Sequence, residues 1–308
     1  MFSRSGSCSL GRWDEARRLP GRYQMIDISS HRTRSSTLNN HSDGVKGQRT
    51  VVVGASSGIG RGLAVRLAEQ GATVVAAARR LDRLAELPGV TPVACDVTAG
   101  GQVEALVASA VEHMGGLDAL VYAAGLSRLH RLEHADLSDW QELYATNLFG
   151  AVLLTRAALP HLLADGSQGR AVYLSSDSAD RAYPGLVIYG TTKAALSSYA
   201  QGLASEFTSL RVTEILVGPT AGTEVADHFD PDLFGEWLPR WFEQGFVRYD
   251  MLQVDDVAAM IVEALDAADP SPRVMATGAE GGQSLSEAEQ AAPDDQSPVG
   301  AALREPER

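Results

Sequence analysis

The chain has 308 residues, 44% of them apolar, which is ordinary for a globular protein with a packed core. Its 39 Asp and Glu residues outnumber its 26 Lys and Arg residues, and the net charge of -13 argues against nucleic acid as a partner, because phosphate binding needs clustered cations. No apolar run has the length of a membrane span, and two cysteines, Cys8 and Cys95, provide no disulfide framework.

Both ends of the chain differ from its middle. Residues 1–49 hold nine Lys/Arg and four Asp/Glu, so +5 there (9 - 4) leaves -18 for the remainder (-13 - 5). Ser- and Arg-rich residues 1–45 are predicted to form a disordered basic extension, and residues 279–308 a disordered tail. Two alternatives stay open for the extension, namely an organellar transit peptide or a true start at Met25. Otherwise the low cysteine content suits a reducing compartment, and we expect a cytoplasmic protein.

Between these ends, strand-like and helix-like segments alternate. Strands are predicted at 49–54, 72–79, 90–97, 117–125, 170–176, 210–218 and 272–277, and helices at 58–71, 80–87, 99–114, 138–163 and around Tyr189. Ser138 and Gln141 have the spacing of a capping box and are predicted to open the fourth helix. The pattern predicts one doubly wound Rossmann-type α/β domain over residues 46–278. Its parallel sheet of about seven strands has helices on both faces and binds ligands at the carboxyl ends of the strands.

The first strand and helix are joined by the sequence VGASSGIG. Gly54, Gly58 and Gly60 allow a tight turn and a close approach of a ligand to the backbone. Ser56 and Ser57 add hydroxyl donors beside the free N–H groups of the helix. A bare glycine pattern is as often a plain turn, but the apolar strand before it and the amphipathic helix after it favour a dinucleotide phosphate site.

The end of the second strand indicates which dinucleotide binds. It reads AAARR, so Arg79 and Arg80 stand where NAD-selective folds carry an acid for the ribose 2′-hydroxyl. A guanidinium pairs with a 2′-phosphate, which a carboxylate would repel. We therefore predict NADP(H) over NAD(H), with Arg79 as the contact and Arg80 as a solvated strand end.

Over about residues 46–278, the sequence resembles the short-chain dehydrogenase/reductase family. GASSGIG matches the family's G-x-x-x-G-x-G, and CDV, YAAG, TNLFG, LSS and YGTTK follow in the family's order. The resemblance implies further cofactor contacts at Ile59, Asp96, Val97, Ala123, Ala124, Gly125, Pro219 and Thr223. Three departures occur: Tyr122 and Ala123 replace two asparagines, Val53 replaces a threonine, and the order of Gly218 and Pro219 is inverted.

The resemblance also implies the catalytic residues Asn147, Ser176, Tyr189 and Lys193. A phenol with a pKa of about 10 is a poor base at neutral pH, and a nearby cation lowers that pKa. Tyr189 and Lys193 are four residues apart, so they are neighbours on one helix face. Tyr189 is then the general acid and base, and Lys193 tunes it; both also contact the cofactor. Ser176 would hold the substrate oxygen, and Asn147 would position a water that links Lys193 to solvent.

Residues 220–252 resemble the family's substrate lid. The aromatic residues there are Phe229, Phe234, Trp237, Trp241, Phe242, Phe246 and Tyr249. They favour a lipophilic carbonyl or alcohol substrate, and a subunit contact is an equally good interpretation. No His/Cys/Asp cluster has metal-ligand spacing, so no metal is predicted. The resemblance implies a homodimer or homotetramer.

The predicted function is therefore hydride transfer between NADP(H) and a carbonyl or secondary alcohol. Two alternatives are kept. One is a non-catalytic NAD(P)-binding redox sensor on the same fold, and the other is a related chemistry such as epimerisation or enoyl reduction.

Overall fold

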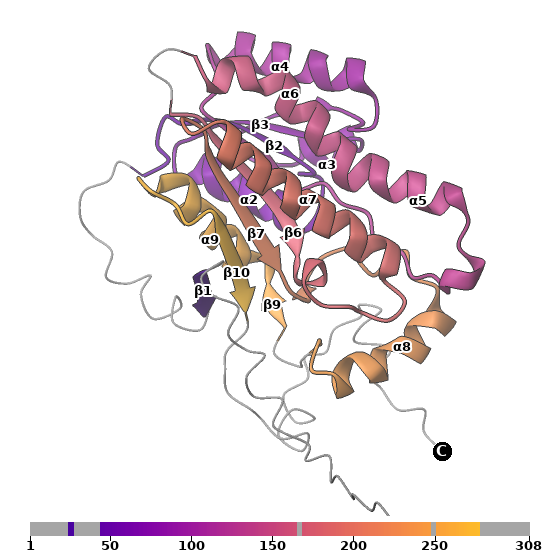
Figure 1. Cartoon of the computed structure of the whole chain (residues 1–308). Helices are drawn as coiled ribbons and strands as arrows, with labels where there is room; N and C mark the ends of the chain where they lie inside the picture. The colour runs from indigo at the N-terminus through magenta and orange to yellow at the C-terminus, as the bar shows by residue number, and fades with distance from the viewer. Residues whose placement is uncertain (1–23, 28–43, 165–167, 248–250, 278–308) are drawn as a thin grey trace, which may run out of the picture.

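In the computed structural model, which describes residues 24–27, 44–164, 168–247 and 251–277, parallel strands form one sheet in the order β1-β10-β7-β6-β5-β2-β3-β4 (Figure 1). The strands of this sheet are β1 (Gln24–Asp27), β2 (Arg49–Val53), β3 (Thr73–Ala78), β4 (Val90–Ala94), β5 (Ala119–Tyr122), β6 (Arg170–Ser176), β7 (Arg211–Val217) and β10 (Arg273–Thr277). Two short strands, β8 (Thr220–Ala221) and β9 (Leu252–Gln253), pair with each other. The predicted parallel sheet is confirmed, with one strand more than expected.

The additional strand, β1, comes from the segment that we interpreted as an extension. Its residues pair in parallel with β10, from Gln24 opposite Val274 to Asp27 opposite Thr277. A stretch of four residues with polar ends gives no periodicity from which a strand can be predicted. Residues 1–23 and 28–43 of the extension and the predicted tail at 279–308 lie outside the described residues.

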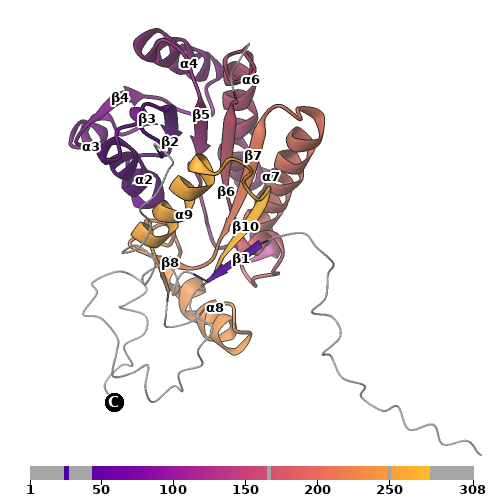
Figure 2. The ribbon, with the colours of Figure 1, turned by 90° about the vertical axis from the view of Figure 1, so that its left-hand side faces the viewer.

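Helices cover both faces of the sheet, as predicted. The helices are α2 (Gly58–Glu69), α3 (Leu81–Ala85), α4 (Gly100–Met114), α5 (Leu137–Tyr144), α6 (Gly150–Leu162), α7 (Val187–Glu206), α8 (Pro231–Glu243) and α9 (Val254–Asp266). Figure 2 shows α2 and α9 on one side of the strands and α6 and α7 on the other. Across the described ranges, no helix combines the length and the apolar character that a bilayer crossing requires.

Burial on both faces explains why the strands are almost continuously apolar. Successive side chains of a strand point to opposite faces, so Val52 packs in the core that contains Leu63 of α2. Its neighbour Val51 packs in the core that contains Leu106 of α4 and Leu154 of α6. Each such side chain contributes about 1.5–3 kcal/mol through burial, and both cores fix the sheet between the two helical layers.

The helix predicted over 138–163 is divided by a π-helical turn. Its first part, α5, is capped by Asp136, whose side chain accepts hydrogen bonds from the N–H groups of Ser138 at 2.8 Å and Asp139 at 3.3 Å. The prediction that Ser138 and Gln141 form the capping box was therefore wrong, because Asp136 is an equally good cap two residues earlier. Between α5 and α6, residues Ala145–Phe149 form the π-helical turn, a feature that often marks functional sites.

Candidate active site

The glycine turn after β2 packs directly against the loop after β5. A Cβ atom at Gly54, where φ is +88°, would lie 2.4 Å from the Ala124 nitrogen and 2.6 Å from the Ala123 carbonyl carbon. A Cβ at Gly60 would lie 2.3 Å from the Gly54 oxygen. Both glycines are therefore required by close backbone packing. Because β2 lies between β3 and β5, the chain reverses its direction of winding at this point, and the crevice at the carboxyl ends of the strands opens here.

The N-terminus of α2 faces this crevice with its backbone donors. Ser57 is the N-cap and its side chain makes no capping hydrogen bond, so the first N–H groups of α2 have no side-chain partner at the cap. Gly58, with a φ of +53°, starts the helix, and Gly60 is buried within its first turn. Ile59 packs against the core shared by α2 and α9. The turn thus has the form expected of an anion-binding site.

At the end of β3, Arg80 rather than Arg79 contacts the glycine turn. The Nη2 of Arg80 donates to the hydroxyls of Ser56 at 2.9 Å and Ser57 at 3.0 Å. Arg79 is exposed. Hydrogen bonds from Thr98 lower the pKa of Asp96, and the positive charge of Arg79 makes a smaller contribution in the same direction. We expected Arg80 to be a solvated strand end, and its contact with the turn differs from that expectation. The assignment of Arg79 to the 2′-phosphate stays a prediction.

The loop after β4 carries the predicted Asp96 and Val97. The Oδ1 of Asp96 accepts hydrogen bonds from the N–H of Thr98 at 2.9 Å and from its hydroxyl at 2.8 Å. Val97 is buried, and a Cβ at Gly150 of α6 would lie 2.9 Å from the Cβ of Val97. The loop is therefore fixed both by its own turn and by the start of α6.

Tyr122, a departure from the family's pattern, has a structural role. It is fully buried, and its hydroxyl donates to the carbonyl oxygen of Thr146 in the π-helical turn. The next residue, Asn147, is also fully buried; its Oδ1 accepts from the Leu126 N–H at 2.7 Å and its Nδ2 donates to the Leu126 carbonyl at 2.9 Å. The same Nδ2 donates to Thr192 of α7 at 2.9 Å. The two side chains therefore join β5, the π-helical turn, the loop after β5 and α7.

Ser176 ends β6 and lies beside Tyr189. Its Oγ accepts from the N–H of Ser178 at 3.1 Å and donates to the Oδ1 of Asp177 at 3.3 Å. A hydrogen bond between Ser176 and Tyr189 lowers the pKa of the phenol, although burial has the larger effect in the opposite direction. The structure thus brings the predicted serine and tyrosine together.

Lys193 lies one helical turn after Tyr189 and is buried. Its Nζ donates to the carbonyl oxygen of Leu174 at 3.0 Å and lies 5.7 Å from the centroid of the Tyr189 ring. A Cβ at Gly125 would lie 3.5 Å from this nitrogen and 3.8 Å from the Oδ1 of Asn147, so the loop after β5 borders the ammonium. Of the predicted catalytic residues, all four therefore meet where β5, β6 and α7 converge.

Burial dominates the ionisation of the tyrosine and the lysine. It raises the pKa of Tyr189 to about 12, and the charge of Asp177 raises it as well. It lowers the pKa of Lys193 to about 8, against an opposing contribution from Glu214. We expected Lys193 to lower the pKa of Tyr189, but within the protein alone burial has the largest effect and raises this pKa.

Asp177 is a buried carboxyl beside this group that the sequence analysis did not single out. Its Oδ2 accepts from the hydroxyl of Tyr183 at 2.7 Å and lies 3.6 Å from the Nη1 of Arg181. Burial raises the pKa of Asp177 above its usual range, while Tyr183 and Arg181 oppose that shift. An acid directly after the predicted serine is visible in the sequence, but only the packing of Tyr183 makes it part of the site.

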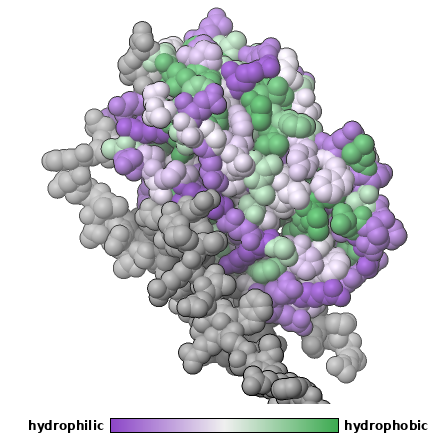
Figure 3. Space-filling view, in the orientation of Figure 1, coloured by the Kyte–Doolittle hydropathy of each residue, from purple (hydrophilic) through white to green (hydrophobic). Residues whose placement is uncertain are grey.

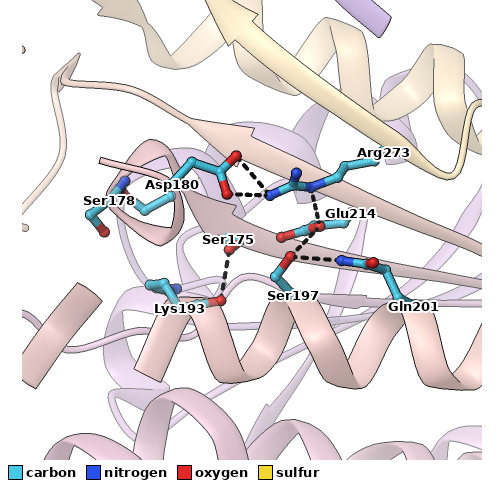
Figure 4. A network of polar contacts seen from close by, with 9 residues as sticks. Ser175, Ser178, Asp180, Lys193, Ser197, Gln201, Glu214 and Arg273 are labelled. Carbon is cyan, nitrogen blue, oxygen red and sulfur yellow. Dashed lines mark hydrogen bonds and ion pairs between the residues drawn. The ribbon is translucent and has the colours of Figure 1, made fainter. Parts of the chain in front are cut away.

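A second buried acid, Glu214 of β7, lies behind Lys193. Figure 4 shows it between α7 and β10, where its Oε2 accepts from Ser197 at 2.9 Å and from the Nε of Arg273 at 2.9 Å. Arg273 also binds both carboxylate oxygens of Asp180, at 3.0 and 2.9 Å. Glu214 is 1% exposed, so its charge acts on Lys193 through a medium with little water.

The segment after β7 crosses the front of the glycine turn. Pro219 accepts from the N–H of Leu252 at 3.1 Å, and the Thr223 hydroxyl donates to the Thr220 carbonyl at 3.0 Å. A Cβ at Gly58 would lie 3.4 Å from the Cγ2 of Thr223. Thr223 therefore lies over the N-terminus of α2, and its expected contact with the cofactor stays a prediction.

The aromatic region that we expect to form the substrate lid packs against Tyr189. Tyr183, Phe234 and Trp241 are buried in one cluster, and Tyr189 packs against it. The indole of Trp241 donates to the carbonyl oxygen of Pro184 at 2.9 Å, which attaches α8 to the loop after β6. Four more of the predicted aromatic residues, Phe229, Trp237, Phe242 and Phe246, pack against the same cluster, and Tyr249 lies outside the described residues. The cluster is thus apolar on the side that faces Tyr189.

Among the described residues, no group of three or more His, Cys, Asp or Glu side chains is arranged to hold a metal ion. The absence of a metal from the reaction stays a prediction.

Residues 48–233 match the family model described as short chain dehydrogenase. The glycine betaine reductase ATRR of Emericella nidulans is 35% identical over 231 residues, which are 72% of this chain and 18% of that protein. The 11-beta-hydroxysteroid dehydrogenase A of Sesamum indicum is 37% identical over 176 residues, which are 54% of this chain and 50% of that protein. The chain therefore spans less than two thirds of the length of both relatives.

A solved structure supports the same relationship. The short chain dehydrogenase from Burkholderia cenocepacia in complex with NADP has a TM-score of 0.66 at 26% identity, and the match covers 75% of this chain and 97% of that one. Relatives carry the names of reductases and dehydrogenases, and the motifs of the resemblance meet at one crevice. With the family model matched over more than half of its length, this chain belongs to the short-chain dehydrogenase family of NAD(P)-binding oxidoreductases.

Proposed function

We propose that this chain interconverts a carbonyl compound and a secondary alcohol with NADP(H), and that Tyr189 is the general acid and base. The observation that carries the proposal is the grouping of Ser176, Tyr189 and Lys193 beside the glycine turn. The Lys193 nitrogen lies 5.7 Å from the Tyr189 ring centroid and borders Gly125 in the loop after β5. Ala123 and Ala124 of the same loop pack against Gly54. A substrate oxygen near Ser176 and Tyr189 is thus close to the crevice of the sheet.

The residues at this crevice fit a dinucleotide. Gly54 and Gly60 leave no room for side chains, and the uncapped N-terminus of α2 offers donors to a pyrophosphate. Arg80, held by Ser56 and Ser57, is our assignment for the 2′-phosphate in place of Arg79. The remaining contacts are assigned to Gly58, Ile59, Asp96, Val97, Ala123, Ala124, Gly125, Lys193, Pro219 and Thr223. The bound nicotinamide supplies or accepts the hydride.

The ionisation of the site favours a proton donor in the direction of reduction. With a pKa of about 12, the Tyr189 phenol holds its proton at neutral pH and can give it to a substrate oxygen. The 3.3 Å hydrogen bond from Ser176 to Asp177 is long, so its hydroxyl can turn to the substrate at little cost. Lys193, with a pKa of about 8, is a source for the replacement proton. Asn147 acts as a positioning residue that holds the loop after β5, and its link to a water stays a prediction.

The lid supports a lipophilic substrate. Tyr189 packs against an apolar cluster that includes Tyr183, Phe234 and Trp241, so a substrate that reaches the phenol contacts aromatic surface. The relative named a hydroxysteroid dehydrogenase supports the same class.

A second copy of the chain is our proposal for the face formed by α5, α6 and α7. Figure 3 shows apolar side chains gathered over these helices. Leu137 is 71% exposed and Phe149 is 54% exposed, and Tyr144 packs between Trp140 and Phe149. Sedimentation analysis of a Leu137→Glu variant, which should shift the protein towards monomer, tests this assignment.

The decisive experiment on function is Tyr189→Phe, with Tyr199→Phe on the same helix as the matched control. Tyr199 packs edge-on against Tyr173, away from the lid. Loss of a general acid should reduce the turnover of a ketone panel with NADPH by about 10²–10⁴-fold. NADPH affinity should fall by no more than about tenfold, the equivalent of one hydrogen bond to the cofactor. The control should keep its activity. Full turnover in Tyr189→Phe contradicts the acid–base role, and an unchanged cellular effect without turnover supports the redox-sensor alternative.

A further inference from the structure

Two ion pairs that share Glu224 lie outside the catalytic group, at the place proposed for the 2′-phosphate of the cofactor. The Oε2 of Glu224 accepts from the Nη2 of Arg80 at 2.8 Å, and its Oε1 accepts from the Nη1 of Arg83. Glu224 follows Thr223 in the segment between β8 and α8, whereas the two arginines begin and continue α3. The carboxylate therefore joins the approach to the lid to the edge of the nucleotide crevice.

Arg80 is shared between this carboxylate and the glycine turn. The nitrogen that binds Glu224 also donates to the hydroxyls of Ser56 at 2.9 Å and Ser57 at 3.0 Å. A single guanidinium, that of Arg80, thus connects the Glu224 carboxylate to the two serine hydroxyls at the N-terminus of α2. Carboxylate and phosphate oxygens seek the same donors on an arginine, so one guanidinium edge serves only one of them at a time.

Glu224 is an anion at any pH at which the enzyme works. Partial burial raises its pKa, but hydrogen bonds from Arg80, Arg83 and Ser57 outweigh this effect and lower the pKa to about 2. A negative group so placed repels a second negative group at the same arginines. The 2′-phosphate is the part of NADP(H) that NAD(H) lacks, so the repulsion falls on only one of the two cofactors.

We propose that Glu224 sets the balance between NADP(H) and NAD(H) by competing with the 2′-phosphate for Arg80 and Arg83. This inference rests on the proposed cofactor site. NADP(H) binds only after the carboxylate has left the two arginines, and NAD(H) binds with the ion pairs intact. Glu224 therefore lowers the selectivity that the arginines alone would give. When the Glu224 carboxylate leaves the arginines, the segment from Thr223 to α8 moves with it. Binding of the phosphate therefore changes the position of the substrate lid.

The test compares Glu224→Gln with a matched variant, Glu236→Gln. Glu236 lies on α8 and pairs with Arg131, and its ion pair is about as exposed as that of Glu224 (side chains 29% and 41% exposed against 34% and 40%). It belongs to the lid but has no contact with the arginines of α3. Both variants remove one negative charge from the same region, so a general effect of charge on cofactor binding appears in both.

Calorimetric titration with NADPH, NADH, 2′-AMP and 5′-AMP gives the readout. Glu224→Gln should bind NADPH and 2′-AMP about three- to tenfold more tightly than the unmodified protein, because the phosphate no longer displaces a charged hydrogen-bonded group. NADH and 5′-AMP should change by less than about twofold. Glu236→Gln should leave all four affinities unchanged. Hydrogen exchange in residues 222–227 should rise with 2′-AMP and stay constant with 5′-AMP.

The outcomes separate this inference from the proposed function. If the unmodified protein binds NADH as tightly as NADPH and Arg80→Ala changes neither, the cofactor assignment itself is wrong. If the unmodified protein prefers NADPH but Glu224→Gln weakens that preference or leaves it unchanged, Glu224 organises the arginines and does not compete for them. Equal gains for NADPH and NADH also overturn the inference, since competition acts on the phosphate alone.

Discussion

The Nζ of Lys193 lies 5.7 Å from the centroid of the Tyr189 ring, and burial shifts both groups towards their neutral forms. The pKa of the lysine is about 8 and that of the tyrosine is about 12. At neutral pH the phenol is therefore protonated, which suits reduction of a carbonyl. Oxidation of an alcohol needs the phenolate, so its rate should rise with pH in the alkaline range.

The position of that alkaline rise should depend on Asp177. Of the residues that the structure describes, Ser176 and Asp177 act on the ionisation of Tyr189 and Lys193 lies near its ring, and the negative charge of Asp177 raises the pKa of the phenol. Asp177→Asn removes this charge, so the pKa of Tyr189 should fall and the pH profile of alcohol oxidation should move to lower pH. Asp227→Asn, an exposed carboxylate before α8, serves as the control. A profile that stays in place or moves to higher pH contradicts the role given to Asp177.

Arg80 and Arg79 should differ in their effect on the cofactor. Arg80 donates to Ser56 and Ser57, whereas Arg79 is exposed. Arg80→Ala should weaken NADPH binding by about 10–100-fold, the equivalent of one or two charged hydrogen bonds, and leave NADH binding within about twofold. Arg79→Ala should have the smaller effect in the same titration. The reverse order would restore Arg79 as the phosphate contact.

Tyr122→Phe tests whether the hydroxyl under the π-helical turn serves the reaction. It leaves the Thr146 carbonyl without its donor, and the free energy of unfolding should fall by about 1–2 kcal/mol. Tyr173→Phe is the matched control, because Tyr173 is equally buried and its hydroxyl bonds to Thr155 at 2.6 Å. Both variants should lose similar stability in denaturant titrations, but only Tyr122→Phe should lower kcat. Equal kcat values in the two variants indicate that the hydroxyl has a purely structural role.

Two glycines should respond oppositely to alanine. Gly54 has a φ of +88° and no room for a Cβ, so Gly54→Ala should cost at least about 1 kcal/mol of stability and abolish cofactor binding. Gly202 lies within α7, and a Cβ there meets no atom within 4 Å. Gly202→Ala should therefore stabilise the protein by about 0.5–1 kcal/mol. Thermal and denaturant unfolding give both values, and a stabilised Gly54→Ala variant would contradict the packing described here.

The elements that could be predicted well are strands buried on both faces, which are continuously apolar, and helices buried on one face, which have apolar residues at helical spacing. In strands such as β2 and helices such as α2, the order of apolar and polar residues itself indicates which side chains are buried. Ser176, Tyr189 and Lys193 could be predicted because one strand end and one helix fix them together. In contrast, β1 was missed because its pairing depends on the backbone of β10, at the other end of the chain.

The errors within the site have local causes. We predicted that β3 extends to residue 79, but it ends at Ala78, and Arg80 becomes the N-cap of α3. That shift turns Arg80 towards the glycine turn. The contact of Glu224 with Arg80 joins residues 144 positions apart, so no spacing in the sequence indicates it. Asp177 and Tyr183 are only six positions apart, but the loop between them follows neither the helical nor the strand period, so their contact could not be predicted either. The raised pKa of Tyr189 was missed because the sequence shows the neighbouring cation but gives no measure of hydration.

The pairing of β1 with β10 has a consequence for aggregation. With Gln24–Asp27 in place, the outward-facing hydrogen-bonding groups of β10 are occupied by the same chain. A version of the protein that begins after residue 27 would leave that strand as an open edge, and unpaired strand edges recruit strands from other molecules. With β1 in place the sheet instead ends on a strand of only four residues, and very short edge strands offer little backbone for a neighbouring copy to pair with.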